Sequence, residues 1–174
     1  MESIGNDIIN PALMLAISRM KEHNNQDTQN KMVEEALNAR FLVPCEMKFA
    51  PGTEHEQKRT PANTFPNINL IKTTEGKLYF MAFTDMGELK KWQDKDGQNV
   101  LIMSFDDVAG LALNPKSNTE GFVINPSTTN VVFQNQLIAT ILHNRDQAIK
   151  DGKMHVVSPK EMEIKRRKQE TELS

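Results

Sequence analysis

Cys45 is the residue whose type best suits nucleophilic chemistry, and it is the only cysteine in the chain. A cysteine attacks as the thiolate, which forms readily only beside a base or in a positive field. Cys45 instead ends an apolar run, residues 41–45, in which a small thiol usually packs against its neighbours. We therefore interpret it as a packing residue. A single cysteine also forms no internal disulfide, which suits a reducing cytosol.

The four histidines are scattered along the chain, and their spacing does not predict a metal site. His23, His55, His143 and His155 stand one to a segment, whereas zinc sites normally use closely spaced pairs of ligands. Assembly of a site from separate segments stays open. The string His143-Asn144-Arg145-Asp146 is only superficially like a kinase catalytic loop, because it lies on a predicted amphipathic helix. We expect no metal and no cofactor.

Two acidic segments have simpler structural than catalytic explanations. Asp94-Lys95-Asp96-Gly97 begins like a calcium loop, but Trp92 and Met103 stand where the full pattern needs acidic residues, so a turn is predicted. Asp106-Asp107 could form a catalytic pair, in which one carboxyl group donates a proton and the other accepts one. A helix cap followed by an acid in the first turn explains this pair more simply. We therefore assign no catalytic residue.

Charge and glycine patterns argue against phosphate-bearing partners. The eight glycines form neither a dinucleotide-binding nor a phosphate-loop pattern. The basic cluster Lys165-Arg166-Arg167-Lys168 is nearly cancelled by its acidic neighbours, and the chain's net charge is −2, whereas nucleic-acid-binding proteins usually show a basic excess. No apolar run approaches the roughly 20 residues that span a bilayer, and the first residues do not have the pattern of a signal peptide. We predict neither a nucleic-acid nor a membrane partner.

The elements that must position these residues begin with two short amphipathic helices. Asn10-Pro11 has the types of a helix cap and first residue, and Asp27 or Thr28 is the expected cap of the second helix. Residues 41–45 predict a strand in which Pro44, lacking an amide donor, indicates an edge position or an irregularity. Residues 49–66 are rich in proline and charge without an apolar period, which predicts a long loop that is mobile or functional.

The remaining chain alternates strands and helices. A strand from Ile68 turns at Glu75-Gly76 into the apolar run 78–83, and the second strand of this hairpin should be central in its sheet. Asp85 should cap a short helix with Glu88 as its reciprocal partner. The periodicity and the turn residues predict further strands over 100–105, 121–124, 131–133 and 154–157, and helices from Asp106 and over 134–150.

These elements predict an α+β fold with a mixed central sheet of about five to six strands flanked by helices, after two N-terminal amphipathic helices. We expect one domain over residues 1–157. Residues 158–174 form a charged C-terminal tail, in which Glu161/Lys165 and Glu163/Arg167 have helical spacing.

Four segments occur in an order typical of one protein family. Residues 39–45 carry an A-x-F-L-V-P strand, and residues 78–92 carry an aromatic strand followed by A-F-T-D, E-L and a tryptophan. Phe105-Asp106-Asp107 matches F-x-D, and residues 121–126 match G-hydrophobic-V-I-N-P. In this order the segments resemble the N-terminal domain of the SseB (serine-sensitivity-enhancing) proteins, over about residues 30–145.

The resemblance implies a small α+β domain without catalytic residues to carry over. Longer members continue into a second conserved domain, which we do not expect in this chain. We expect a soluble, cytoplasmic, bacterial protein that acts as a non-enzymatic protein-interaction or regulatory module with an unknown protein partner. The alternative is a small-molecule-binding domain or an enzyme whose site assembles only in the fold. Homo-oligomer formation through the first two helices or the tail stays open.

Overall fold

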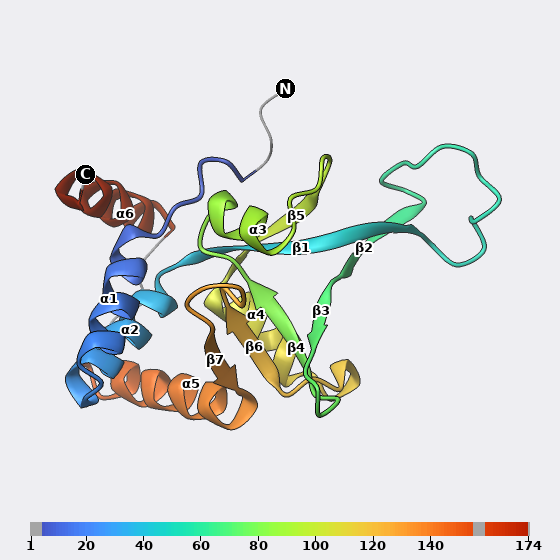
Figure 1. Cartoon of the computed structure of the whole chain (residues 1–174). Helices are drawn as coiled ribbons and strands as arrows, with labels where there is room; N and C mark the ends of the chain where they lie inside the picture. Colours follow the sequence, from blue (N-terminus) through green and yellow to red (C-terminus); the bar gives the residue numbers. More distant parts are fainter. Residues whose placement is uncertain (1–4, 155–158, 174) are drawn as a thin grey trace.

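The computed structural model describes residues 5–154 and 159–173. Its first two elements are the expected helices, α1 (Pro11–Glu22) and α2 (Gln26–Leu37), which lie side by side (Figure 1). Asn25, rather than Asp27 or Thr28, caps α2, because its side chain accepts a hydrogen bond from Thr28 N at 3.0 Å. Thr28 Oγ1 accepts in return from Asn25 N at 3.1 Å, which completes a capping box.

Seven strands form two sheets, so the α+β class is confirmed within the described residues. The first sheet has the order β2-β1-β5 and is antiparallel throughout, with bounds β1 (Arg40–Phe49), β2 (Thr64–Ile68) and β5 (Asn99–Ser104). The second has the order β3-β4-β6-β7, with bounds β3 (Leu70–Lys72), β4 (Leu78–Ala82), β6 (Gly121–Ile124) and β7 (Val131–Gln134). In the second sheet β4 and β6 run parallel, and β4 lies in the interior as predicted.

The prediction of one central sheet is wrong, because a single isolated bridge, Leu42 to Phe83, is all the pairing between β1 and the end of β4. Leu42 N donates to Phe83 O at 2.8 Å and Phe83 N donates to Leu42 O at 2.9 Å, just beyond the end of β4. The predicted strand from Ile68 is divided at Asn69, since Ile68 pairs with β1 whereas Leu70 pairs with β4. The chain therefore passes from one sheet to the other at Asn69.

Pro44 lies in the interior of the first sheet, so the predicted edge position is wrong and the predicted irregularity is present. Asn69 N donates to Pro44 O at 3.0 Å, and Pro44 has no amide hydrogen with which to return the bond. This position falls between the Leu42–Phe83 bridge and the ladder with β2. The missing donor is therefore placed where β1 changes partners.

The core is built on both faces of the four-stranded sheet. On one face, Phe122 of β6 stacks on Phe133 of β7 at 5.1 Å between ring centroids, and both rings lie nearly perpendicular to the ring of Phe105. The helices that cover this face are α1, α2, α4 (Phe105–Leu113) and α5 (Asn135–Lys150). Met81 and Phe83 face the other side, where Leu89 of α3 (Met86–Trp92) covers them. Each such buried side chain stabilises the fold by about 1.5–3 kcal/mol.

The end of the chain forms a helix, α6 (Pro159–Leu173), which lies against α1 (Figure 1). The tail is therefore helical over these residues. Of the predicted strand over 154–157, residues 155–157 lie outside the described residues, and Met154 is not in a strand. A short 3₁₀ helix, η1 (Pro115–Ser117), precedes β6. Within the described ranges, no helix combines the length and the apolar character needed to cross a bilayer.

Candidate functional site

Cys45 is a packed thiol in β1. Its side chain is 2% exposed, and burial raises the pKa of the thiol above its usual value. A nucleophilic cysteine needs the opposite shift, because only the thiolate attacks. The geometry therefore supports the interpretation of Cys45 as a packing residue.

The histidines lie on different elements of the fold. His23 directly follows α1, His55 lies in the loop between β1 and β2, and His143 is exposed on α5. His155 lies outside the described residues. Over residues 5–154 and 159–173, no group of three or more histidine, cysteine or acidic side chains is arranged to hold a metal ion.

Asp106 and Asp107 lie in the first turn of α4 and bind different partners. The helix begins at Phe105 and its cap is Ser104, not Asp106 as predicted. Ser104 N donates to Asp107 Oδ2 at 3.0 Å, and Asp107 N donates to Ser104 Oγ at 3.2 Å. Asp106 accepts from Arg145 Nη1 of α5 at 2.7 Å. The two carboxylates therefore act separately, one in a capping box and one in an ion pair between helices.

The other two charged segments belong to local structure, one to a turn and one to a helix. Asp94-Lys95-Asp96-Gly97 forms the predicted turn between α3 and β5, with Gly97 at a φ of 71°. The basic cluster at residues 165–168 lies on α6, where Arg167 Nε is 3.5 Å from Glu163 Oε1. This pair confirms the helical charge spacing expected for the tail.

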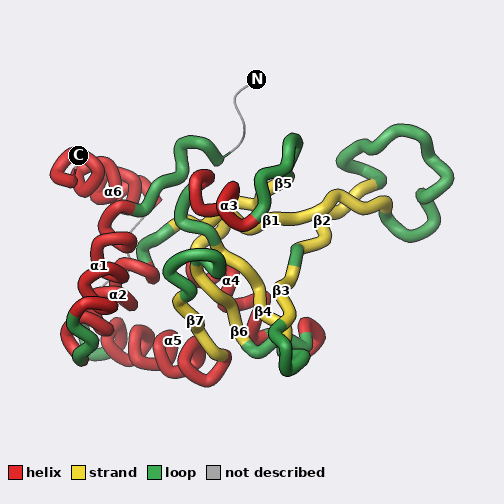
Figure 2. The backbone as a smooth tube through the Cα atoms, viewed as in Figure 1, coloured by secondary structure: helices red, strands yellow, loops and turns green. Residues whose placement is uncertain are grey.

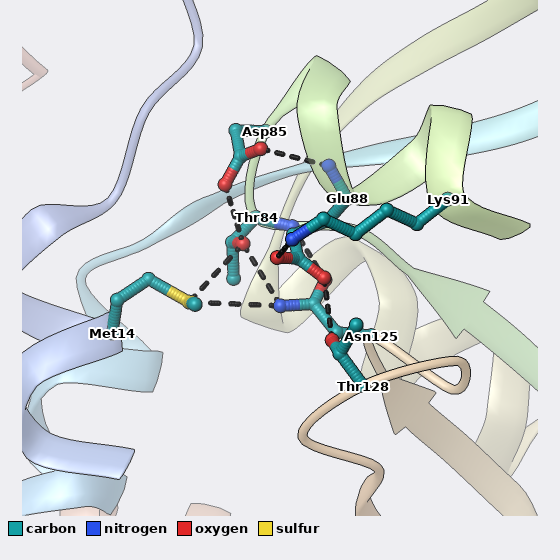
Figure 3. A network of polar contacts seen from close by, with 7 residues as sticks. All are labelled: Met14, Thr84, Asp85, Glu88, Lys91, Asn125 and Thr128. Carbon is teal, nitrogen blue, oxygen red and sulfur yellow. Dashed lines mark hydrogen bonds and ion pairs between the residues drawn. The ribbon is translucent and has the colours of Figure 1, made fainter. Parts of the chain in front are cut away.

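The A-F-T-D and V-I-N-P segments meet in one polar network with a buried centre, drawn in Figure 3. Thr84 follows β4 and Asn125 follows β6, and the parallel pairing of these strands places the two residues side by side. Asn125 is 1% exposed, its Oδ1 accepts from Thr84 N at 3.1 Å, and its Nδ2 donates to Thr84 Oγ1 at 2.9 Å. We call the seven residues of Figure 3 (Met14, Thr84, Asp85, Glu88, Lys91, Asn125 and Thr128) the Thr84 network.

The network continues into the first turn of α3. Asp85 Oδ1 accepts from Glu88 N at 2.9 Å, which confirms Asp85 as the helix cap. Glu88 does not return this bond as predicted, since its carboxylate accepts instead from the Thr128 hydroxyl and from Lys91 Nζ at 2.8 Å. Burial by itself raises the pKa of Glu88, but the hydrogen bonds from Lys91 and Thr128 outweigh it and hold this pKa below its usual range. Glu88 therefore ties α3 to the turn after β6.

Asn10 ties α1 to the same region. It stands at the cap position of α1, but its side chain makes no cap hydrogen bond. Its Nδ2 instead donates to Arg40 O and Thr84 O, each at 2.7 Å. Asn10, Thr84 and Asn125 are buried, and their hydrogen bonds join separate elements of the fold. We therefore assign them a structural role and not a ligand-binding one.

The part of the molecule that stands out from the core is a β-hairpin, which we call the arm (residues 46–68). Figures 1 and 2 show β1 and β2 running away from the helices to a loop at the tip. The loop covers residues 50–63, so both ends of the predicted loop over 49–66 belong to strands. Most side chains of the loop are exposed.

Asn63 gives the loop a defined shape. It is 3% exposed, its Nδ2 donates to the Glu56 carboxylate and to Lys58 O, and its Oδ1 accepts from Thr60 N at 2.6 Å. Thr53 Oγ1 closes the base of the loop by donating to Ala50 O at 2.7 Å. The loop is therefore held by its own hydrogen bonds and presents an ordered surface.

A groove of about 340 Å³ runs along the arm where it leaves the body, and we call it the edge groove. Lys48, Arg59 and Lys95 line it, whereas Glu46 is the one carboxylate in its wall. The other lining residues are Cys45, Met47, Gly97, Gln98 and Asn99. The side chains that line the groove therefore carry a net positive charge, although the whole chain has a net charge of −2.

Sequence reasoning missed the residues that make the edge groove. Lys48, Arg59 and Lys95 come from β1, the loop and the turn before β5, and no spacing links them. It also placed Thr84 and Asn125 in motifs without predicting that they bond to each other. The parallel pairing of their strands was the missing information.

Comparisons with known proteins agree with the sequence resemblance. A family model described as the SseB protein N-terminal domain matches residues 13–140, which begins earlier than the expected residues 30–145 and includes most of α1. Searches of curated proteins and of solved structures gave no match.

Proposed function

Because the chain belongs to the SseB N-terminal-domain family, we propose that it is a non-enzymatic protein-interaction or regulatory module that binds a protein partner through the arm. The observation that carries this proposal is the projecting arm with its ordered, exposed loop. Ordering a residue costs about 1–2 kcal/mol of backbone entropy, and the loop recovers little of this cost by burial. Loops held on rigid scaffolds are common binding elements.

A loop exchange tests this proposal with the whole chain. Ala50 N donates to Asn63 O at 2.7 Å, so these residues form a hydrogen-bonded pair that an Asn-Gly turn in place of residues 51–62 would close. We expect this variant to unfold at the same denaturant concentration as the natural chain but to lose the partners that the natural chain captures from the source cell. The control is Glu75→Asn, which places an Asn-Gly pair in the three-residue loop of the β3–β4 hairpin and should keep those partners. Retention of all partners by the loop-exchange variant would contradict the proposal.

The edge groove supports a second candidate function, the binding of a small anionic molecule. Its volume of about 340 Å³ lies in the range of ligand sites, which is roughly 300–1,000 Å³. Its lining is mostly polar, whereas small-molecule sites are mostly apolar, so a protein partner is favoured. Thermal-shift screening against amino acids, nucleotides and metal ions tests this candidate, since a ligand of the native state raises the midpoint.

The proposal includes a cytoplasmic location in a bacterial cell. Self-association through the first two helices or the tail stays a prediction, which light scattering of the whole chain would test.

A further inference from the structure

We propose that the edge groove binds an extended, acidic peptide segment of a partner protein, which adds as a strand to the free edge of β1 next to β5. This inference rests on the proposed function, because it assumes that the arm is a binding surface. It adds the chemistry of the partner and the atoms that recognise it.

The edge of β1 becomes free where β5 ends. The two strands pair from Arg40↔Ser104 to Cys45↔Asn99, and beyond Asn99 the chain turns away at Gly97. Alternate residues of a strand face the same edge, so Met47 and Phe49 follow Cys45 on this side. By this alternation the amides of Met47 and Phe49 point away from β2, and the pairing with β5 ends at Cys45, before it reaches them. The edge therefore offers two amide donors to an added strand.

The other edge of the arm is protected against strand addition by a proline. Ala50 bonds to Asn63 and Pro44 bonds to Asn69, so by alternation Phe65 and Asn67 also face β1. Pro66 therefore faces outward on β2 and has no amide hydrogen to donate. Proline on an outer edge is a common protection against strand pairing. The β1 edge of the arm is therefore the edge better suited to strand addition.

The charge of the groove selects an acidic segment. Lys48, Arg59 and Lys95 line it against the single carboxylate of Glu46, although the whole chain has a net charge of −2. Asp94 and Asp96, which flank Lys95 in the turn, do not line the groove. Opposite charges across an interface favour encounter and suppress wrong partners.

Two polar groups of the groove are placed to bind an added peptide, Arg59 by exchanging its present partner and Gln98 Oε1 because it has none in the described part of the chain. Arg59 Nη1 donates to Met47 O at 2.6 Å, and a peptide amide that took its place on Met47 O would release the guanidinium to bind a carboxylate. Gln98 Oε1 is buried and has no hydrogen-bond partner among the described residues. A buried acceptor without a donor costs about 1–3 kcal/mol, which a peptide N–H would recover.

The test selects peptides on the whole chain and then examines how they bind. A displayed library of random peptides of about eight residues, slightly longer than an ordinary strand, is panned against the natural chain. We expect the recovered peptides to be enriched in aspartate and glutamate and depleted in proline. A fluorescein-labelled recovered peptide then gives dissociation constants by fluorescence anisotropy.

Met47→Pro removes one amide donor from the free edge and leaves the ladder with β2 intact, because Met47 faces away from β2. We expect the dissociation constant of the peptide to rise about tenfold or more for Met47→Pro and for Lys95→Glu. Lys116→Glu makes the same charge change on η1 and should leave the dissociation constant unchanged. A peptide N-methylated at alternate amides should also lose binding, which tests strand addition even where Met47→Pro fails to fold.

Recovery of no peptides, recovery of peptides without acidic enrichment, or indifference to both Met47→Pro and N-methylation overturns the inference. These results leave the proposed function intact if partner capture still depends on the loop. If the loop-exchange variant instead keeps every partner, the proposed function and this inference are both overturned.

Discussion

Asn125→Ala should destabilise the protein far more than the removal of one exposed asparagine would. Asn125 is almost fully buried, has a left-handed φ of 48°, and exchanges two hydrogen bonds with Thr84. The substitution removes both hydrogen bonds and places an alanine in a backbone conformation that asparagine tolerates better.

The magnitude follows from these two losses. Thr84 N becomes a buried donor without an acceptor, which costs about 1–3 kcal/mol. The left-handed conformation costs alanine about 1 kcal/mol more than asparagine. The sum is about 2–4 kcal/mol, a large share of the 5–15 kcal/mol that stabilises a typical domain.

Urea unfolding followed by Trp92 fluorescence measures this loss, since Trp92 packs on Phe83 at 5.7 Å between ring centroids. Asn125→Gly keeps the backbone freedom and loses only the hydrogen bonds, so it should cost about 1–3 kcal/mol. Asn118→Ala is the matched control, because exposed Asn118 has a φ of 52° and should cost about 1 kcal/mol. An effect of Asn125→Ala no larger than that of Asn118→Ala would refute the role given to the Thr84 network.

Three further predictions follow from buried groups. Glu88→Gln should lower the free energy of unfolding by about 1 kcal/mol at neutral pH. Because the folded-state pKa of Glu88 lies below the ordinary 4.5, this difference between the two proteins should be present above pH 4.5 and vanish as the pH falls through the folded-state pKa. Unfolding titrations at several pH values measure it. Gly121→Ala should lower the free energy of unfolding by about 4 kcal/mol or more, since a Cβ at a φ of 151° would lie 1.9 Å from Phe133 O. A variant that unfolds at the same urea concentration as the natural chain would contradict this close approach. Cys45 should react with Ellman's reagent at pH 8 on the order of 100-fold more slowly in the native chain than in urea, and equal rates would show that its thiol is accessible.

The apolar strands and helices of the core could be predicted from the sequence, because each carries its own signal. Residues 78–83 form an unbroken apolar run and β4 is interior, and Asp85 caps α3 as its type indicates. Helix α5 has the predicted bounds to within one residue. These features depend on local patterns that burial then reinforces.

The sheet arrangement and the arm could not be predicted in the same way. Whether β1 and β4 join one sheet depends on the single bridge between Leu42 and Phe83, which no local pattern encodes. The ends of the predicted loop at Phe49 and Pro66 are strand residues with little burial, so they lack the alternation that marks a strand. The edge groove is formed by three distant segments and has no sequence signal at all.

Amide hydrogen exchange on the whole chain, alone and with a partner captured from the source cell, would locate the binding surface that we assign to the arm. Partner binding should slow exchange in the arm, residues 46–68, and most clearly at the amides of Met47 and Phe49 on its free edge. The amides around Thr84 and Asn125 should be protected equally in both samples. Protection that appears on α1, α2 or α5 while the arm exchanges at its free rate would contradict the assignment of binding to the arm.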